Sequence, residues 1–369
     1  MKSFLIVVSF IILFGIGIWL HLNDSNSTTT TQQTLEQVNK EETLSTEQFV
    51  IDYLLSEDGT IRTDIKPNTN SNIALSESIG LWMEYLAEKG DLPQFEEAYR
   101  TIKDQFLAKN NLLFWKIENG QAALSNALID DLRVMEALFK VGERSNNQHY
   151  IHTAKSIANA VLNYNREGSF FVDFYEMELE EKGDILTLTY LNPSAFQYMV
   201  KYNVLSEYEM DELRKFMSEI PMENGFYPKS FRQSDDTFQF DSTVNLIDQL
   251  YVALHLERFD INTDQFFEWI HKTFYNENLL YGQYDQKTKK NAVQYESVAV
   301  YALVILYSIE KQEYSLAEDI YYRMIRLRNN NPDASYFGGF VTSDTTHSFD
   351  NLLALLAERK LVNEQVINP

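Results

Sequence analysis

Residues 76–108 read SESIGLWMEYLAEKGDLPQFEEAYRTIKDQFLA, and this stretch decides the fold. Apolar side chains recur every three to four residues on both sides of Gly90, which predicts one helix over 76–89 and a second over 92–108. The turn at Gly90 is short. Two helices joined by so short a connection pack as an antiparallel hairpin.

The same helical pattern continues along most of the chain, with short Gly, Asn, Asp or Pro turns between neighbours. An open solenoid of repeats would show self-similarity at a fixed period of about 34 to 47 residues, and no such period occurs. We therefore expect an all-α fold, an (α/α)6 barrel of six helical hairpins. The predicted helices cover 46–56, 76–89, 92–108, 125–142, 147–163, 192–203, 206–218, 241–257, 263–273, 293–310, 314–328 and 347–359.

One segment near 169–190 interrupts the helices. Two β-branched and aromatic runs, 170–175 and 185–190, flank Glu181-Lys182-Gly183-Asp184. This pattern predicts a small β-hairpin insertion.

In a ring of antiparallel hairpins, every second helix begins at the same rim. Carboxylates, amides and hydroxyls recur at all six of those starts. Such residues are common N-caps, so any one of them is explained by capping alone. Their aromatic neighbours indicate a cleft in addition, because sugar rings stack on aromatic faces while carboxylates bind hydroxyls. The six starts are Ser76-Glu77-Ser78, Asp130-Asp131, Asn192-Pro193-Ser194, Asp241-Ser242-Thr243, Tyr295-Glu296-Ser297 and His347-Ser348-Phe349-Asp350.

The N-terminal part differs from the rest. Lys2 precedes an apolar run from Phe4 to Leu20, so residues 1–22 are expected to be a membrane anchor or a signal segment. No small-residue cleavage site follows the run, which favours an uncleaved anchor with the remainder outside the membrane. Residues 23–42 are polar and predict a flexible tether, and residues 43–369 form the working domain.

Composition excludes several classes of function. The 31 Lys and Arg residues against 54 Asp and Glu give a net charge of −23, so no nucleic-acid partner is expected. There is no cysteine, which excludes disulfides, thiol nucleophiles, thiolate metal sites and lipid attachment to cysteine within these residues. His149 and His152 read as a surface pair rather than a metal site. We expect no cofactor and no metal.

Four segments, taken in order, resemble glycoside hydrolase family 8, whose members are (α/α)6 barrels that cleave β-1,4 polysaccharides. Residues 76–83 resemble the family's SEGxxYGM segment. Residues 114–117 and 127–132 are similar to its AW-R-V strand and its ATDxDLDIA segment. The run 191–196 resembles its NPSYF segment, and 240–242 stand where the family has YDAxR.

The resemblance implies a role for each matched residue. Glu77 would be the general acid and Asp241 the base of an inverting glycoside hydrolase, with Asp131 holding the sugar ring at the cleavage subsite. Inversion requires the two carboxyls to lie about 6.5–9.5 Å apart. A helix start lowers a carboxyl pKa, so burial against Trp82 and repulsion from Asp131 must raise that of Glu77, while the pKa of Asp131 is expected not to rise. Further substrate contacts are expected from Asp130, Trp82, Trp115, Asn192, Tyr190 and Phe240.

The chain departs from the family's motifs at Ser78, Trp82, Ile129, Arg133 and Val244. A second hypothesis is therefore a barrel that has lost catalysis and binds polysaccharide or assists exopolysaccharide assembly. A helical scaffold for protein partners is a third. The strongly acidic domain favours a neutral or deacetylated polysaccharide as its partner, at a site outside the cytoplasm.

Overall fold

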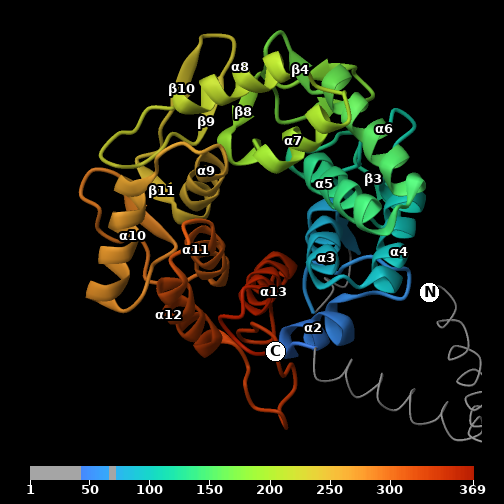
Figure 1. Ribbon diagram of the computed structural model, residues 1–369. Coiled ribbons are helices and arrows are strands. Elements are labelled where there is room, and N and C mark those ends of the chain that lie inside the picture. Colours follow the sequence, from blue (N-terminus) through green and yellow to red (C-terminus); the bar gives the residue numbers. More distant parts are fainter. Residues whose placement is uncertain (1–42, 66–71) are drawn as a thin grey trace, which may run out of the picture. The chain divides into compact units, whose positions relative to one another are not determined.

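A computed structural model describes residues 43–65 and 72–369 of the chain (Figure 1). Residues Leu44–Asn368 form one compact unit. The predicted anchor over 1–22 and the tether over 23–42 lie outside the described residues. Within the described part, no helix is both long enough and apolar enough to cross a bilayer.

Six inner helices of this unit form a closed ring (Figure 1). Each contacts the next inner helix along the chain, and the last one, α13, returns to pack against the first, α3. This closure confirms the barrel and excludes an open spiral. The inner helices are α3 (Ser76–Lys89), α5 (Leu128–Ser145), α7 (Pro193–Lys201), α9 (Leu246–Arg258), α11 (Val298–Glu310) and α13 (Ser348–Asn363).

The remaining helices lie outside the ring, as Figure 1 shows. Outer helices α4, α6, α8 and α12 pack on the inner helix that is next to them in sequence. This arrangement of inner and outer helices confirms the predicted (α/α)6 fold. The outer elements are α2 (Ser45–Phe49) with the π-turn η1 (Val50–Leu54), α4 (Leu92–Thr101) with η2 (Ile102–Phe106), α6 (Gln148–Tyr164), α8 (Glu207–Ser218), α10 (Asp264–Glu277), and α12 (Tyr314–Met324) with the 3-10 turn η4 (Ile325–Leu327).

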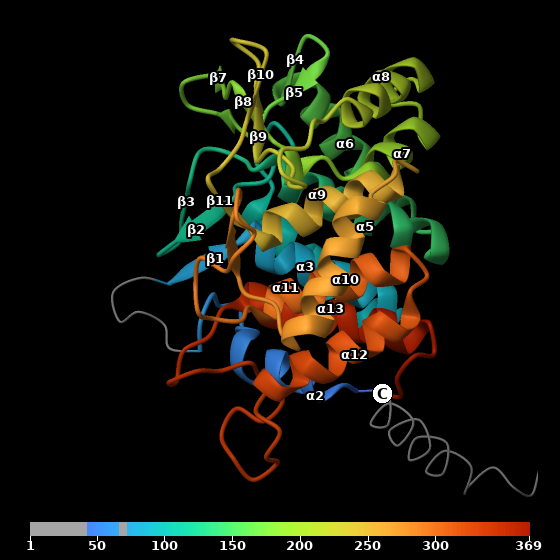
Figure 2. The same ribbon diagram turned by 90° about the vertical axis from the view of Figure 1, so that its left-hand side faces the viewer.

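Short antiparallel strands occupy the connections that lead into the inner helices. Several of them, β1, β2, β3 and β11, lie on the left of the ring in Figure 2. They pair as β1–β2–β3, β10–β9–β8, β11–β12, β4–β5 and β6–β7. The strands are β1 (Ile73–Leu75), β2 (Lys116–Glu118), β3 (Gln121–Ala122), β4 (Arg166–Glu167), β5 (Phe170–Phe171), β6 (Tyr175–Glu176), β7 (Glu181–Lys182), β8 (Ile185–Thr187), β9 (Ser230–Arg232), β10 (Thr237–Gln239), β11 (Thr243–Asn245) and β12 (Gln283–Asp285).

The predicted β-hairpin near 169–190 is present, but its turn is elsewhere. Strands β6 and β7 pair around a turn in which Glu180 takes a positive φ of 55°. The predicted pairing of 170–175 with 185–190 is wrong, because β8 pairs with β9, more than forty residues further along the chain.

Two inner helices begin five residues later than predicted. Helix α9 starts at Leu246 rather than 241, and Asn245 caps it by accepting a hydrogen bond from the Ile247 amide at 3.0 Å. Helix α11 starts at Val298 rather than 293. For α9 the reason is the pairing of β11 with β12, which holds residues 243–245 extended.

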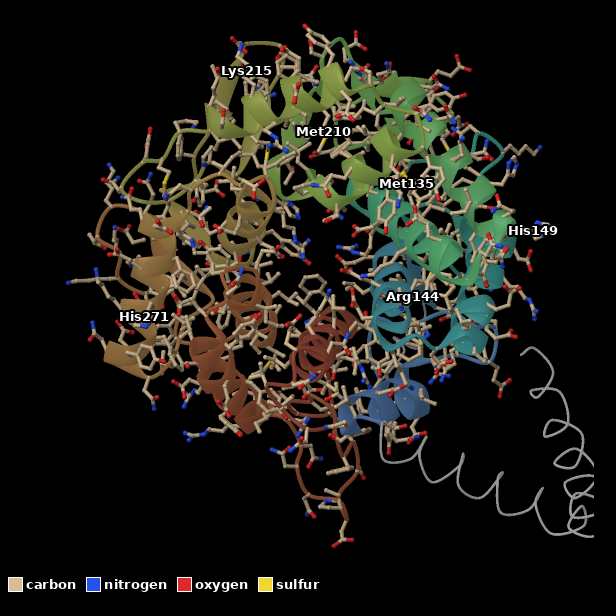
Figure 3. The ribbon with its side chains drawn as sticks, viewed as in Figure 1. Met135, Arg144, His149, Met210, Lys215 and His271 are labelled. Carbon is tan, nitrogen blue, oxygen red and sulfur yellow. The ribbon has the colours of Figure 1, made fainter. Side chains whose placement is uncertain are left out.

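The core is continuous around the ring. Helix α11 is its most apolar member, and its residues from Ala299 to Ser308 are all buried. A helix that is apolar on every side must be covered on every side, which suits an inner wall between two neighbours and an outer helix. The outer surface is polar, and His149 lies on it at the start of α6 (Figure 3). His149 and His152 are both exposed, so the predicted surface pair is confirmed.

Candidate active site

Glu77 is the second residue of α3, and this helix follows β1 directly. Its backbone position is fixed by the neighbouring Ser76, whose amide donates to the Trp115 carbonyl at 3.1 Å. This bond ties the start of α3 to the loop before β2. The Glu77 side chain is partly buried, and it lies where the ring of inner helices begins.

The surroundings of Glu77 favour its protonated form. Burial, followed by the charges of Asp130 and Asp350, raises the pKa of Glu77 from 4.5 to about 7, and the Arg133 guanidinium opposes this rise. The expected direction of the pKa shift is confirmed. One expected cause was wrong, because the repelling carboxylates are Asp130 and Asp350 rather than Asp131.

Asp130 of α5 connects the start of α3, beside Glu77, to α5. Its side chain accepts a hydrogen bond from Ser76 Oγ at 2.6 Å and another from Arg133 Nη1 at 3.0 Å. Only 4% of Asp130 is exposed. Burial raises the pKa of Asp130, and Arg133 and Ser76 act against that rise. Asp130 was expected to contact substrate; in this structure its two carboxylate oxygens are bonded to Ser76 and Arg133 instead, and the substrate contact stays a prediction.

Asp131 is bonded to protein groups in the wall of the barrel. It is fully buried, and its two carboxylate oxygens accept hydrogen bonds from the Leu113 amide at 2.8 Å and from Asn126 Nδ2 at 2.6 Å. Substrate hydroxyls cannot reach either oxygen in this arrangement. Burial raises the pKa of Asp131 to about 8, so the expectation of no rise was also wrong. In this structure Asp131 anchors the loop before α5.

The two tryptophans point in different directions. Trp82 is 2% exposed, stacks on Tyr85 with ring centroids 5.3 Å apart, and borders a groove between residues 55–59 and α4 on the outer side of α3. So little of the Trp82 ring is exposed that it offers almost no surface for the predicted contact with substrate. Trp115 is 37% exposed beside Ser76, with Lys116 Nζ 5.3 Å from the centre of its ring. Trp115 can present an aromatic face to a ligand.

Three other predicted residues lie at different depths. Tyr190, in the 3-10 turn η3 (Leu188–Tyr190), is near the site, because burial and the charges of Asp173, Asp130 and Glu77 raise its pKa. Asn192 caps α7 and donates from Nδ2 to Glu136 at 2.6 Å, which places it inside the ring beside a cavity of about 40 Å³. Phe240 is partly buried directly before Asp241.

Asp241 does not open α9, contrary to expectation. It is exposed, two residues before β11 and five before the helix. Asp248 lies in the first turn of α9 instead. Burial raises the pKa of Asp248, the Lys229 charge opposes this rise, and the Asp241 carboxylate adds to it. The two aspartates are therefore electrostatic neighbours on the α9 side of the rim.

The prediction missed a regular feature of this rim. Asp130, Asp248 and Asp350 are each the third residue of their inner helix, in α5, α9 and α13. Burial raises the pKa of all three. Asp350 also accepts a hydrogen bond from the Ala299 amide of α11 at 3.2 Å. An acidic residue in a helix's first turn is common, so the sequence alone did not distinguish Asp248 from an ordinary cap.

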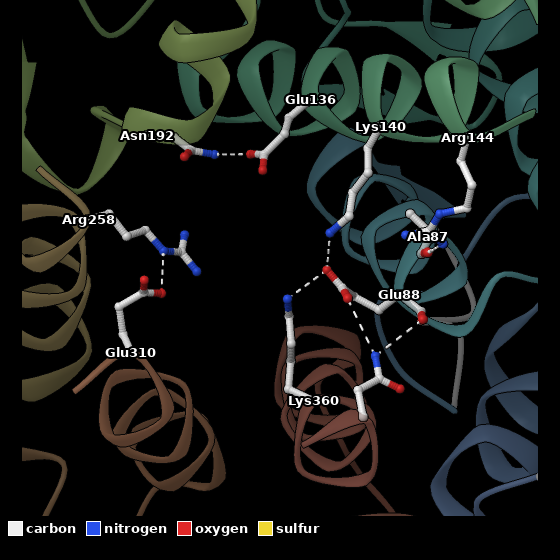
Figure 4. Close-up of polar contacts among 10 residues, drawn as sticks. Ala87, Glu88, Glu136, Lys140, Arg144, Asn192, Arg258, Glu310 and Lys360 are labelled. Carbon is white, nitrogen blue, oxygen red and sulfur yellow. Dashed lines mark hydrogen bonds and ion pairs between the residues drawn. The ribbon is translucent and has the colours of Figure 1, made fainter. Parts of the chain in front are cut away.

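The opposite end of the ring is charged but balanced, as Figure 4 shows. Glu88, at the end of α3, contacts Lys140 and lies 2.7 Å from Lys360, while Arg258 Nε is 3.1 Å from Glu310. Cations at helix C-termini are favoured by the helix dipole. These residues border a cavity of about 250 Å³, to which all six inner helices contribute.

Sequence comparison identifies one clear relative. The chain is 39% identical over 359 residues to "Putative lipoprotein YdaJ" of Bacillus subtilis (strain 168), an alignment that covers 97% of this chain and 98% of YdaJ. No protein-family model matches the chain.

Solved structures share the fold. A Clostridium perfringens protein described as a novel alpha-amylase superposes with a TM-score of 0.80 and 26% identity, over 87% of this chain and 97% of that one. PssZ from Listeria monocytogenes superposes with a TM-score of 0.72 and 25% identity, over 87% of this chain and 96% of PssZ. Endoglucanase Cel10 of Klebsiella pneumoniae, a family 8 glycosyl hydrolase, superposes with a TM-score of 0.60 and 15% identity, over 86% of this chain and 99% of Cel10. The chain therefore belongs to the family of YdaJ and has the six-hairpin (α/α)6 fold of glycoside hydrolase family 8.

Proposed function

We propose that this protein is a glycoside hydrolase that cleaves a polysaccharide with inversion of the anomeric carbon, using Glu77 as the general acid. The observation that carries the proposal is the position and pKa of Glu77. A general acid must be protonated near its working pH, and a carboxyl with a pKa of about 7 meets that condition near neutrality. The similarity to an alpha-amylase and to family 8 enzymes supports the same class of reaction.

The base must be a carboxylate that stays ionised and reaches a water on the other face of the sugar. Asp241 is proposed for this role because it is exposed and stands where the family's base stands. Asp248 is a second candidate, since it occupies the first turn of an inner helix as Glu77 does. Its burial favours the neutral form, which suits a base less well.

The substrate is proposed to be a neutral or deacetylated polysaccharide. Carboxylates line the rim at Asp130, Asp248 and Asp350, and the whole chain carries a charge of −23. Such a surface repels uronic-acid polymers. Trp115 supplies an exposed ring for stacking against a sugar. The resemblance to family 8 favours β-1,4 linkages, and the similarity to an alpha-amylase adds α-linked glucans to the substrates that need testing.

The domain is proposed to act outside the cytoplasm, at the cell membrane. The relative YdaJ carries the description "Putative lipoprotein". Since the present 369 residues contain no cysteine, a lipid on cysteine cannot hold them there, and we propose the apolar run from Phe4 to Leu20 as an uncleaved anchor. Mass spectrometry of the membrane-bound protein tests this: an intact N-terminus supports the anchor, and a start after residue 20 refutes it.

The function is tested by incubating the full-length protein with cellulose, mixed-linkage glucan, xylan, chitosan and amylose. NMR follows the anomer of each newly formed reducing end. The proposal expects one of these polymers to be cleaved with the inverted anomer appearing first. Retention of configuration would refute the mechanism. Binding of a polymer without cleavage would instead support the second hypothesis, a barrel that binds polysaccharide.

A further inference from the structure

Arg133 is a buried cation in the ring wall beside the proposed acid. It lies on α5, is 7% exposed, and its Nη1 donates to Asp130 at 3.0 Å. Its Nε is 3.8 Å from the Glu84 carboxylate of α3. Burying a guanidinium is costly unless it is paired, so an arginine in this position requires the two carboxylates that surround it.

The neighbouring helix leaves room for this side chain. Gly80 lies one turn after Glu77 on α3, and a Cβ atom at that position would come within 3.1 Å of Arg133 Cδ and 3.4 Å of Val134 Cγ2. A larger residue at position 80 would push the Arg133 stem away. Glycine in a helix interior costs about 1 kcal/mol relative to alanine, and the space it leaves for Arg133 explains why it is tolerated here.

Arg133 and Gly80 both lie in segments that resemble the motifs of family 8, and both segments differ from those motifs. The family's segment has an acidic residue where this chain has Arg133, and its second glycine falls at the position of Trp82 rather than at Gly80. At this motif position the chain therefore carries a positive charge where the resembled segment carries a negative one.

The charged and titratable groups that face Glu77 come from four elements. They are Asp130 and Arg133 from α5, Asp350 from α13, Tyr190 from η3 and Tyr251 from α9, with His347 beside Asp350. The two aspartates act against ionisation of Glu77, and among the described residues Arg133 is the cation whose charge acts in its favour. The ionisation of Glu77 is therefore favoured by the charge of Arg133 and opposed by those of the two aspartates.

We propose that Arg133 is a positioning residue that holds Asp130 against Ser76 and sets the pH at which Glu77 exchanges its proton. The proposal rests on the proposed function for its catalytic meaning, although the protonation of Glu77 is measurable without a substrate. Without Arg133, Glu77 would lose the cation that favours its ionised form, while Asp350 and any charge remaining on Asp130 would still oppose that ionisation. The pKa of Glu77 would then be higher, so the carboxyl would keep its proton to a higher pH. A carboxyl with a higher pKa is a weaker acid, and it would be a poorer proton donor to the leaving oxygen at neutral pH.

The test is a carbon-13 NMR titration of the full-length protein labelled at glutamate Cδ. Comparison with Glu77→Gln identifies the Glu77 signal. Arg133→Met and Arg133→Gln remove the charge, and Arg133→Lys keeps it. Arg258→Met removes another arginine that borders the inside of the ring and that pairs with Glu310 instead. We expect the Glu77 midpoint to rise by about 1–2 pH units in the methionine and glutamine variants, as loss of one nearby charge implies. It should change by less than about 0.5 unit in Arg133→Lys and in Arg258→Met.

An unchanged midpoint in whichever neutral variant folds would overturn the proposal, and so would an equal rise in Arg258→Met. Circular dichroism shows which variants fold, and Arg133→Gln, which retains a donor for Asp130, carries the test if Arg133→Met does not. On a cleaved polysaccharide, the basic limb of kcat/KM should move by the same interval as the NMR midpoint. If no polymer is cleaved, the proposed function fails while the titration still decides the role of Arg133.

Discussion

Replacing Glu77 by Gln should make the protein more stable, and the gain should grow with pH. The folded protein raises the pKa of Glu77 from 4.5 to about 7. A carboxyl whose folded pKa is raised contributes stability that is fully present below its unfolded pKa and is lost as the pH rises through its folded pKa. At 1.36 kcal/mol per pH unit, the complete loss is about 3 kcal/mol. Glutamine cannot ionise, so Glu77→Gln does not lose this stability as the pH rises.

Urea unfolding at pH 5.5 and pH 8.5 measures this difference. Both values lie above the isoelectric point of about 4.6, where the protein would be least soluble. Between them, the variant's advantage in the free energy of unfolding should grow by about 2 kcal/mol, since part of the loss has already occurred at pH 5.5. Glu212→Gln, on the exposed side of α8, controls for the change in net charge. An advantage that stays constant with pH would show that the fold does not hold Glu77 protonated, and would remove the physical basis for its role as acid.

Three further predictions concern residues whose roles the structure reassigns or leaves for experiment. Asp131→Ala should lower the free energy of unfolding by about 2–4 kcal/mol in urea, because it leaves the buried Leu113 amide without its acceptor and removes one of the hydrogen bonds that Asn126 Nδ2 donates. An unaltered stability would restore a substrate role for Asp131. Trp82→Ala should lower the free energy of unfolding by about 3–5 kcal/mol, because it deletes a core side chain. Trp115→Ala should instead weaken polysaccharide binding by about 1–3 kcal/mol in affinity electrophoresis, with little effect on unfolding. The reverse pattern would show that Trp82, and not Trp115, contacts the polysaccharide. Asp241→Asn should reduce turnover by at least about 100-fold if it is the base, and Asp248→Asn by much less; the opposite ranking would assign the base to Asp248.

The helical hairpins could be predicted because their signals are local. Periodic apolar residues and short turns such as Gly90 specify each pair of helices, and six pairs without a fixed repeat favour a closed ring. The starts of α9 and α11 could not be predicted in this way. The pairing of β11 with β12 joins segments about forty residues apart, and neither segment shows it alone.

The errors at the site concern the direction in which helix residues face. Trp82 follows Glu77 by five residues, which turns its side chain about 140° away around α3 at 100° per residue, so its outward position follows from helix geometry. Asp130 and Asp131 are adjacent and differ by about 100° in direction. Which of them faces the acid depends on how α5 is rotated in the ring, and the motif alone assigned it to the wrong one.

The most direct test of Glu77 as general acid compares two substrates of different leaving-group quality. Once a cleaved polymer is known, kcat/KM of the wild type and Glu77→Gln is measured on that polymer and on an aryl glycoside of the same sugar whose phenolate leaves without protonation. We expect the variant to lose about 10²–10⁴-fold on the polymer and far less on the aryl glycoside, because only the first needs a proton from the enzyme. Equal losses on both substrates, or no loss on the polymer, would contradict the assignment.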